Sequence, residues 1–234
     1  MAYVKTFIPN EADDLHCLQA CHRMLIESLV GSRPTLEDSE RATGFREGWP
    51  TWQFALLRDL ADRGYPVVDI EQFSVDHFLA APEAAIAAQV GDAVVARQIL
   101  NTMDVPLEVE RLRNCRYHDL IRFVNKAPSM ADLRSALSHH AYALCNVNGN
   151  VLHDKVGYVG HLVIVQEVGD DWCSLQDPGL PPGPDMKVSL AKFLEAWHYP
   201  KATMANVYAV FPSRAAWIGF VKSVNVSSIP AVDQ

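Results

Sequence analysis

Between residues 18 and 29, apolar side chains recur every three or four residues, at Leu18, Cys21, Leu25 and Leu29. This period is typical of the buried face of an α-helix. The acidic pair Asp13 and Asp14 can cap the start of the helix, and Gly31 is expected to end it.

The next segments predict further helices and then a strand. We expect helices over residues 36–43 and from Trp49 or Thr51 to Arg63, stopped by Gly64, and a short strand over 66–70. Residues 74–125 are rich in alanine and other helix formers, with few strand formers. This stretch is interpreted as a helical insertion.

The second half alternates short apolar runs with turns. It predicts a helix over 130–137, a strand over 141–147 ending in a turn at 148–150, a hairpin of strands 161–168 and 172–176, a loop over 177–184, a helix over 190–197 and a strand over 206–211. Helices first and an antiparallel sheet later indicate the α+β class. We expect one domain over 1–212, with a C-terminal extension and loose tail over 213–234.

Composition excludes several classes of protein. The net charge of −8 gives no basic surface for nucleic acid or anionic membranes, and no apolar run approaches membrane-spanning length. Without a secretory leader pattern, a cytoplasmic location is expected. Five cysteines are an odd number without framework spacing, which favours free thiols over disulfides. Oligomeric state is not indicated.

Cys17 is the candidate nucleophile. It lies in the first turn of the predicted helix, where unpaired backbone N–H groups and the helix dipole lower the pKa of a thiol. Cys21, one turn later, falls on the apolar stripe and is interpreted as a core residue. A cysteine nucleophile still requires a base.

His161 and Asp177 are the candidate base and its orienting acid. They lie eight residues on either side of Gly169, so the antiparallel hairpin should bring them nearly opposite each other. An acid beside a histidine fixes its tautomer and stabilises the imidazolium. The alternative is a hairpin with incidental polar ends.

The other histidines suggest no metal or cofactor. His139, His140 and His153 lack the spacing of zinc ligands. His16 and His22 are expected to cover surface, although His16 can influence Cys17 electrostatically.

Two blocks carry a resemblance to a known family. DLHCLQACHRMLIESLVG (14–31) resembles the nucleophile helix of papain-like peptidases that trim double-glycine leaders in bacteriocin export, and GHLVIVQEVGDDWCSLQDPG (160–179) is similar to their histidine strand, turn, strand and Asp-Pro. ADLRSALSHHAYALCNV (131–147) resembles the helix and strand before that histidine. The resemblance implies a papain-like fold, with a nucleophile helix and helical cap on an antiparallel sheet, and a Cys17–His161–Asp177 triad.

A second resemblance concerns acyl transfer. His-Cys at the nucleophile and the later FLEAW (193–197) resemble the acyl-transfer enzyme of butirosin biosynthesis and its relatives. These resemblances imply a shared fold and thioester intermediate with different acceptors.

The chain departs from the first family in two places. The family has a glutamine six residues before the cysteine to hold the oxyanion, but Glu11 occupies that position, and an ionised carboxylate cannot donate a hydrogen bond. Asn10, one residue earlier, is the other oxyanion candidate. The insertion is also much longer here and is expected to form a lid or wall. Asp38, Glu40, Trp49 and Trp52 are candidate lining residues, but for the two tryptophans packing within an ordinary helical cap is favoured.

Three functions follow as hypotheses. The first is a hydrolase of peptide or amide bonds. The second is an acyltransferase or peptide ligase with an acyl-donor substrate. The third is a binding module that keeps the fold without catalysis, as Glu11 in the oxyanion position suggests.

Overall fold

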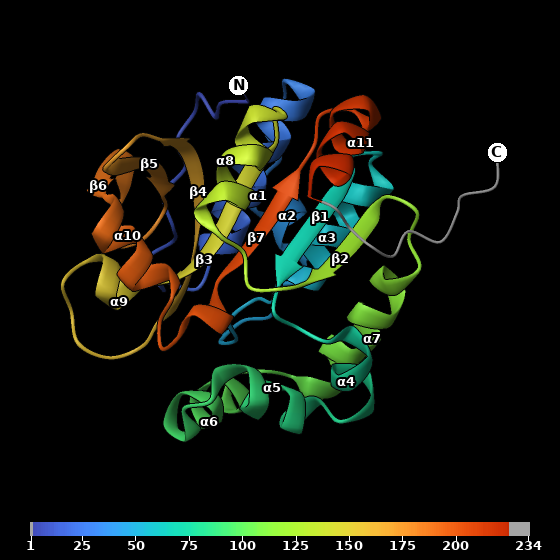
Figure 1. Ribbon diagram of the computed structural model, residues 1–234, viewed down its shortest axis with the longest axis vertical. Helices are drawn as coiled ribbons and strands as arrows, with labels where there is room; N and C mark the ends of the chain where they lie inside the picture. Colours follow the sequence, from blue (N-terminus) through green and yellow to red (C-terminus); the bar gives the residue numbers. More distant parts are fainter. Residues whose placement is uncertain (1, 225–234) are drawn as a thin grey trace.

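A central seven-stranded sheet organises the computed structural model, which describes residues 2–224 (Figure 1). The strand order is β2-β1-β7-β3-β4-β5-β6. Only β1 and β2 pair in parallel, and the other pairs are antiparallel. The strands are β1 (Val67–Glu71), β2 (Ile121–Asn125), β3 (Tyr142–Asn148), β4 (Gly160–Val168), β5 (Trp172–Asp177), β6 (Gly183–Ser189) and β7 (Asn206–Val210).

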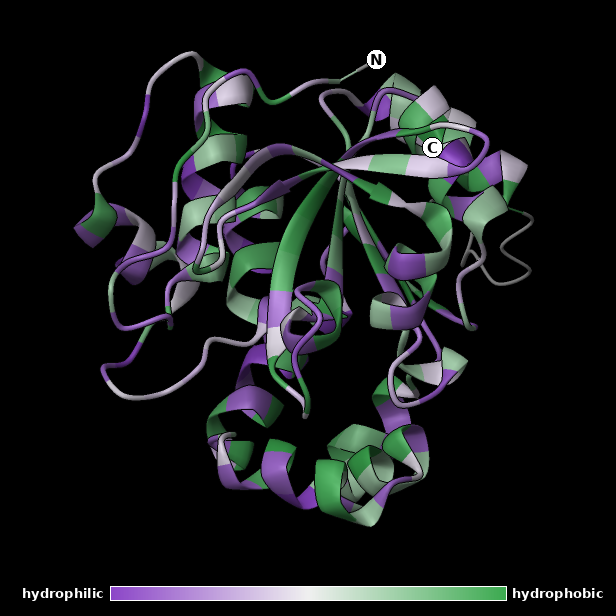
Figure 2. Cartoon of the chain, turned by 90° about the vertical axis from the view of Figure 1, so that its left-hand side faces the viewer, coloured by the Kyte–Doolittle hydropathy of each residue, from purple (hydrophilic) through white to green (hydrophobic). Residues whose placement is uncertain are grey.

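Helices cover both faces of this sheet, and the α+β class is confirmed. The first face carries α1 (Cys17–Val30), α2 (Leu36–Thr43), α3 (Gln53–Asp62) and α7 (Val105–Arg116). The helices α4 (Val75–Ala80), α5 (Pro82–Val90) and α6 (Ala93–Asn101) share the core of this layer but lie below the sheet (Figure 1). The second carries α8 (Met130–Ser138), α10 (Leu190–Trp197) and α11 (Arg214–Ser223), while α9 (Gly149–Leu152) and the 3-10 turn Ala202–Met204 lie in connections. Figure 2 shows apolar residues concentrated in the central strands, as two buried faces require.

The helix α1 is built as its sequence predicts except at its start. Leu18, Cys21 and Leu25 are buried, and Gly31 ends the helix in the left-handed conformation with φ of 81°. The expected acidic cap is wrong, because α1 begins at Cys17 and its N-cap residue, His16, makes no side-chain capping bond. The Asp13 carboxylate instead accepts a hydrogen bond from the backbone N–H of Leu15.

The predicted insertion 74–125 is helical only as far as Arg116. Its last five residues form β2, which pairs in parallel with β1, so the wholly antiparallel sheet that we expected is a mixed sheet. The physical reason is the connection, since parallel neighbours require a long crossover and α4 to α7 supply it. In Figure 1, α4, α5 and α6 lie below the sheet, beyond the lower ends of β1 and β3.

Two further expectations are corrected. The turn at 148–150 is the beginning of α9, and the loop over 177–184 ends in the edge strand β6. Part of the expected C-terminal extension is α11, whose Phe220 and Val221 are buried in the core. The predicted loose tail lies outside the described residues. No helix within residues 2–224 combines the length and apolar character that crossing a membrane requires.

Candidate active site

Cys17 is the first residue of α1 and is half-buried. Because no side chain caps this helix, the backbone N–H groups of its first turn remain available to an anionic group beside the thiol. Most helices begin with a side chain that occupies one of these donors. The uncapped start of α1 therefore places a thiol beside free N–H groups.

His161 and Asp177 lie at the same end of the sheet, because His161 is near the start of β4 and Asp177 is the last residue of the adjacent, antiparallel β5. Their Nε2 and Oδ1 atoms are 2.6 Å apart. Ile164 pairs with Gln176, and a bulge between Val165 and Glu167 shifts the register of the hairpin. The two residues are therefore not directly opposite each other. Their side chains meet diagonally across the two strands, which agrees with the nearly opposite placement expected from the hairpin.

His161 also contacts Cys17, and the two groups shift each other's pKa. Burial alone would raise the pKa of the Cys17 thiol, but a hydrogen bond with His161, its charge and the Leu162 N–H lower that pKa below its ordinary value. Burial opposes charge on His161, yet its hydrogen bonds with Asp177 and Cys17 raise its pKa to about 10. Since Nε2 faces Asp177, Nδ1 is the ring atom left for the thiol. This arrangement favours a thiolate–imidazolium pair at neutral pH.

Asp177 holds two histidines, one of which the sequence analysis missed. It is fully buried; its Oδ1 also accepts the Gly179 N–H at 2.8 Å, and its Oδ2 lies 2.8 Å from His153 Nε2. Burial would raise the pKa of Asp177, but His161, the Gly179 N–H and His153 outweigh it and lower that pKa. No signal in the sequence links His153 to Asp177.

Gly179 lies against the His161–Asp177 pair. A Cβ atom at this position would lie 2.9 Å from Asp177 Oδ1 and 3.1 Å from His161 Nε2. The backbone of Gly179 lies outside the left-handed region, so alanine at this position would cause no backbone strain. The close contact of its Cβ with the pair is the one unfavourable effect expected.

We expect Gly179→Ala to reduce turnover about a hundredfold while the protein stays folded, because displacement of catalytic groups by about 1 Å has effects of that size. The measurement is turnover together with thermal unfolding. Gly219→Ala is the matched control, because its Cβ would meet only the His139 side chain on the other side of the sheet. Unchanged turnover in Gly179→Ala would mean that the pair tolerates displacement.

Asn10 fastens the loop before α1. Its Oδ1 accepts the N–H groups of His16 at 2.7 Å and Glu11 at 2.9 Å, and its Nδ2 donates to Asp14 at 2.8 Å. Its backbone N–H donates to the Pro178 carbonyl at 2.7 Å, which ties this loop to the residue after Asp177. Asn10 thus has a positioning role, and one N–H of its amide remains uncommitted.

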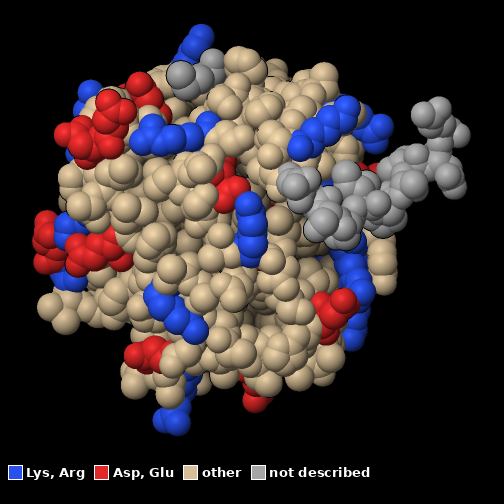
Figure 3. Space-filling view, in the orientation of Figure 1, with Lys and Arg blue, Asp and Glu red and all other residues tan. Residues whose placement is uncertain are grey.

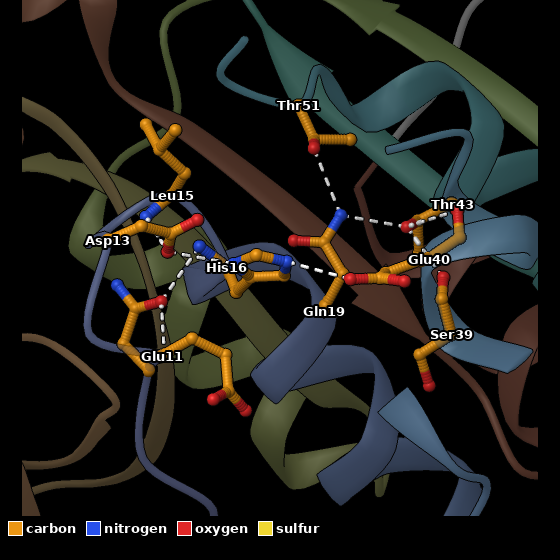
Figure 4. A network of polar contacts seen from close by, with 10 residues as sticks. Glu11, Asp13, Leu15, His16, Gln19, Ser39, Glu40, Thr43 and Thr51 are labelled. Atoms are coloured by element: carbon orange, nitrogen blue, oxygen red, sulfur yellow. Dashed lines mark hydrogen bonds and ion pairs between the residues drawn. The ribbon is translucent and has the colours of Figure 1, made fainter. Parts of the chain in front are cut away.

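Glu11, the other oxyanion candidate, is only half-buried, and in Figure 4 its carboxylate points away from His16 and Gln19. The first-turn N–H groups of α1 are therefore the best placed donors for an oxyanion.

The residue before the nucleophile is locked in place. His16 lies between Asp13 and Glu40, each 2.9 Å from a ring nitrogen (Figure 4). Its ring packs on Phe45, with the two ring centroids 4.0 Å apart. We expected His16 and His22 to cover surface, but both are buried, because polar partners satisfy their ring nitrogens. These contacts fix the start of α1 against α2.

The proposed wall residues have different surroundings. Trp52 lines a cavity beneath the sheet, whereas Trp49 is 38% exposed and packs with Arg46. Glu40 binds His16, as described. Asp38 lies in the first turn of α2, where its backbone N–H donates to the hydroxyl of the N-cap residue Thr35 and its carboxylate accepts from that hydroxyl.

The remaining four thiols are chemically different from Cys17. All four are buried, and burial raises the pKa of each: Cys21, Cys115, Cys145 and Cys173. A raised pKa removes the reactive thiolate at neutral pH. Cys17 is therefore the thiol best suited to nucleophilic chemistry.

Charge is distributed without a dominant sign on the face shown in Figure 3, where Lys and Arg side chains are interspersed with Asp and Glu. Comparisons with models of known protein families and with curated proteins find no match to this chain. The assignment of a function therefore depends on the geometry of the site.

Proposed function

We propose that this protein is a papain-like cysteine enzyme that hydrolyses a peptide or amide bond through a thioester. The observation that carries the proposal is the 2.6 Å contact between His161 Nε2 and the buried carboxylate of Asp177, together with a Cys17 thiol whose pKa His161 lowers. A thiol with a lowered pKa, a base with a raised pKa and a buried acid are the three parts of a nucleophile–base–orienter triad.

In the first half-reaction, the Cys17 thiolate attacks the carbonyl carbon and forms a C–S bond. The carbonyl electron pair moves to oxygen, where the first-turn N–H groups of α1 stabilise it. When the pair returns, the C–N bond breaks and His161 protonates the leaving amine. The products of this step are an amine and a Cys17 thioester.

In the second half-reaction, neutral His161 takes a proton from water as the water oxygen attacks the thioester carbon. The C–S bond breaks, a carboxylic acid leaves, and the thiolate–imidazolium pair is restored. Asp177 holds the His161 ring in one orientation throughout and stabilises its positive charge.

Acyl transfer is the second candidate, because an amine can replace water in the second half-reaction. The observation that favours it is a cavity at the same end of the sheet, lined by Asn148 and Tyr158 beside β4, which offers a place for an acceptor amine. Incubation of the acyl-enzyme with amines and analysis of the products separate the two: a transferase gives the new amide, and a hydrolase gives the acid.

The proposal predicts selective alkylation of Cys17. At pH 7, iodoacetamide followed by peptide mass spectrometry should modify Cys17 at least about tenfold faster than any other thiol, because the other four are buried with raised pKa values. Equal reactivity at all five thiols would contradict the triad and favour a binding module.

The pKa shifts set the pH range of the activity. Turnover should rise as Cys17 ionises below the usual thiol range, because attack requires the thiolate. It should fall only as pH passes about 10, where His161 loses the proton that the leaving amine needs. A rate profile measured from pH 5 to 11 checks both limbs, and an alkaline limb near pH 7 would contradict the raised pKa of His161.

A further inference from the structure

Two carboxylates on β1 are buried, and three of their four oxygens have no hydrogen-bond partner among residues 2–224. Asp69 and Glu71 are 1% and 7% exposed, and as second neighbours in a strand they point to the same face of the sheet. Both oxygens of Asp69 and Oε1 of Glu71 lack a hydrogen-bond partner among residues 2–224. Unpaired buried carboxylates are unfavourable, and proteins rarely keep them without a partner or a function.

The two acids also affect each other. Burial raises the pKa of Glu71 to about 8 against the opposing hydrogen bond of Gln89, and burial with the charge of Glu71 raises the pKa of Asp69 well above its usual value. A cation placed beside them would relieve both effects.

Glu71 lines a cavity of about 50 Å³ that has aromatic walls. The space is sufficient for a few water molecules or a small polar head group. Ring faces attract cations, and the aromatic lining residues include Trp52, Phe54, Phe78, Tyr158, Tyr199 and Tyr208. No Lys, Arg or His lines this cavity in the described part of the chain.

The cavity lies next to the strand that carries His161, although Cys17, His161 and Asp177 are not among the residues that line it. Asn148 lines it and pairs with Gly160, the neighbour of His161. A Cβ atom at Gly160 would lie 3.2 Å from the Tyr158 hydroxyl oxygen, so that ring also borders β4. The strand pairings bring the strand ends that carry Glu71, Asn148, Gly160 and Asp177 to the same end of the sheet.

We propose that this cavity binds a primary ammonium group on an unbranched carbon chain, and that the substrate of Cys17 carries such a group. The second part rests on the proposed function. A metal ion fits less well, because residues 2–224 contain no cluster of three or more metal-ligating side chains. The small volume also favours an ammonium over a planar guanidinium.

The cavity is tested by binding of n-butylammonium and its neutral analogue n-butanol to the wild-type protein, measured by calorimetry at pH 7. We expect the cation to bind with a dissociation constant of about 1 mM and the alcohol roughly tenfold more weakly or worse. Glu71→Gln should remove the preference and remain folded, because the amide avoids burying a charge. Glu110→Gln, an exposed acid on α7, is the matched control and should keep the preference.

Proton release is a second readout. Glu71 on β1, Tyr208 on β7 and Tyr158 before β4 line the cavity, whereas Asp69 on β1 and Cys115 of α7 are titratable groups outside its lining. The tyrosines and the thiol, with raised pKa values, stay protonated at pH 7, so bound cation should drive protons from the carboxyl groups. Heats measured in two buffers of different ionisation enthalpy should therefore differ.

Three outcomes would each overturn the ammonium site. They are equal binding of amine and alcohol, no detectable binding of the amine at about 50 mM, which is 50-fold the expected dissociation constant, and an unchanged preference for the amine in Glu71→Gln. These outcomes do not depend on Cys17, so the binding test stands even where the proposed catalysis fails.

The substrate part is tested by labelling of Cys17 with two iodoacetamides, whose N-alkyl chains of two to six carbons end in an ammonium or a hydroxyl group. The cationic reagent should react roughly tenfold faster at its best chain length, with saturation, and Glu71→Gln but not Glu110→Gln should abolish the advantage. Equal rates for both reagents at every chain length would overturn the link between the cavity and the thiol.

Discussion

Replacement of Cys17 or His161 by alanine is expected to reduce turnover by a factor on the order of 10⁴ to 10⁶ while leaving the fold intact. The two side chains act as one unit, because each maintains the charged state of the other. Loss of either removes the activated thiolate, so the two single variants and the double variant should be equally inactive. Turnover and thermal unfolding of all three are the measurements.

His161→Ala carries a further signature that does not require a substrate. Without the imidazolium, the Cys17 pKa should rise, and alkylation of Cys17 at pH 7 should slow by a factor of about 10 to 100. Cys145→Ala is the control, because it removes a buried thiol on the opposite face of the sheet. Substantial activity in Cys17→Ala or His161→Ala would rule out the triad.

Asp177→Asn is expected to reduce turnover by about 10- to 10⁴-fold. The base remains, but the amide no longer stabilises the imidazolium and can present its N–H₂ to the wrong nitrogen. The pKa of His161 should fall from about 10, so the alkaline limb of the pH profile should move to lower pH. This shift distinguishes an orienting role from a structural one.

His153→Ala is the matched variant for Asp177→Asn. It removes the contact to the other carboxylate oxygen and leaves the His161–Asp177 hydrogen bond. We expect turnover to stay within about tenfold of wild type. An undiminished rate in Asp177→Asn would reduce Asp177 to a structural residue.

Local patterns predicted the elements whose ends are marked by turn residues. Gly31 ends α1 in the left-handed conformation, and Ser189 caps α10 at the predicted position. β2 was missed because it is a short run that directly follows a long helical segment, and its strand state depends on pairing with the distant β1. β6 was missed because it is an edge strand with no buried residue to give an alternating signal.

The sequence predicted those parts of the candidate site whose positions follow from local structure. The hairpin brings His161 to Asp177, and a position near a helix start identified Cys17. His153 could not be found in this way, because its contact depends on the path of the loop between α9 and β4. Asp69 and Glu71 lie within an apolar strand and gave no signal, since their burial depends on the helices of the insertion.

The site joins the first helix of the chain to a hairpin from its last third, and the segment between them includes the whole insertion. Closing so long a loop is slow and entropically unfavourable, so this contact belongs to the late stages of folding. Until the hairpin docks, residue 17 carries a thiol with ordinary acidity. An incomplete or damaged chain would thus hold its nucleophile in an inert state, and reactivity would arise only with the finished structure.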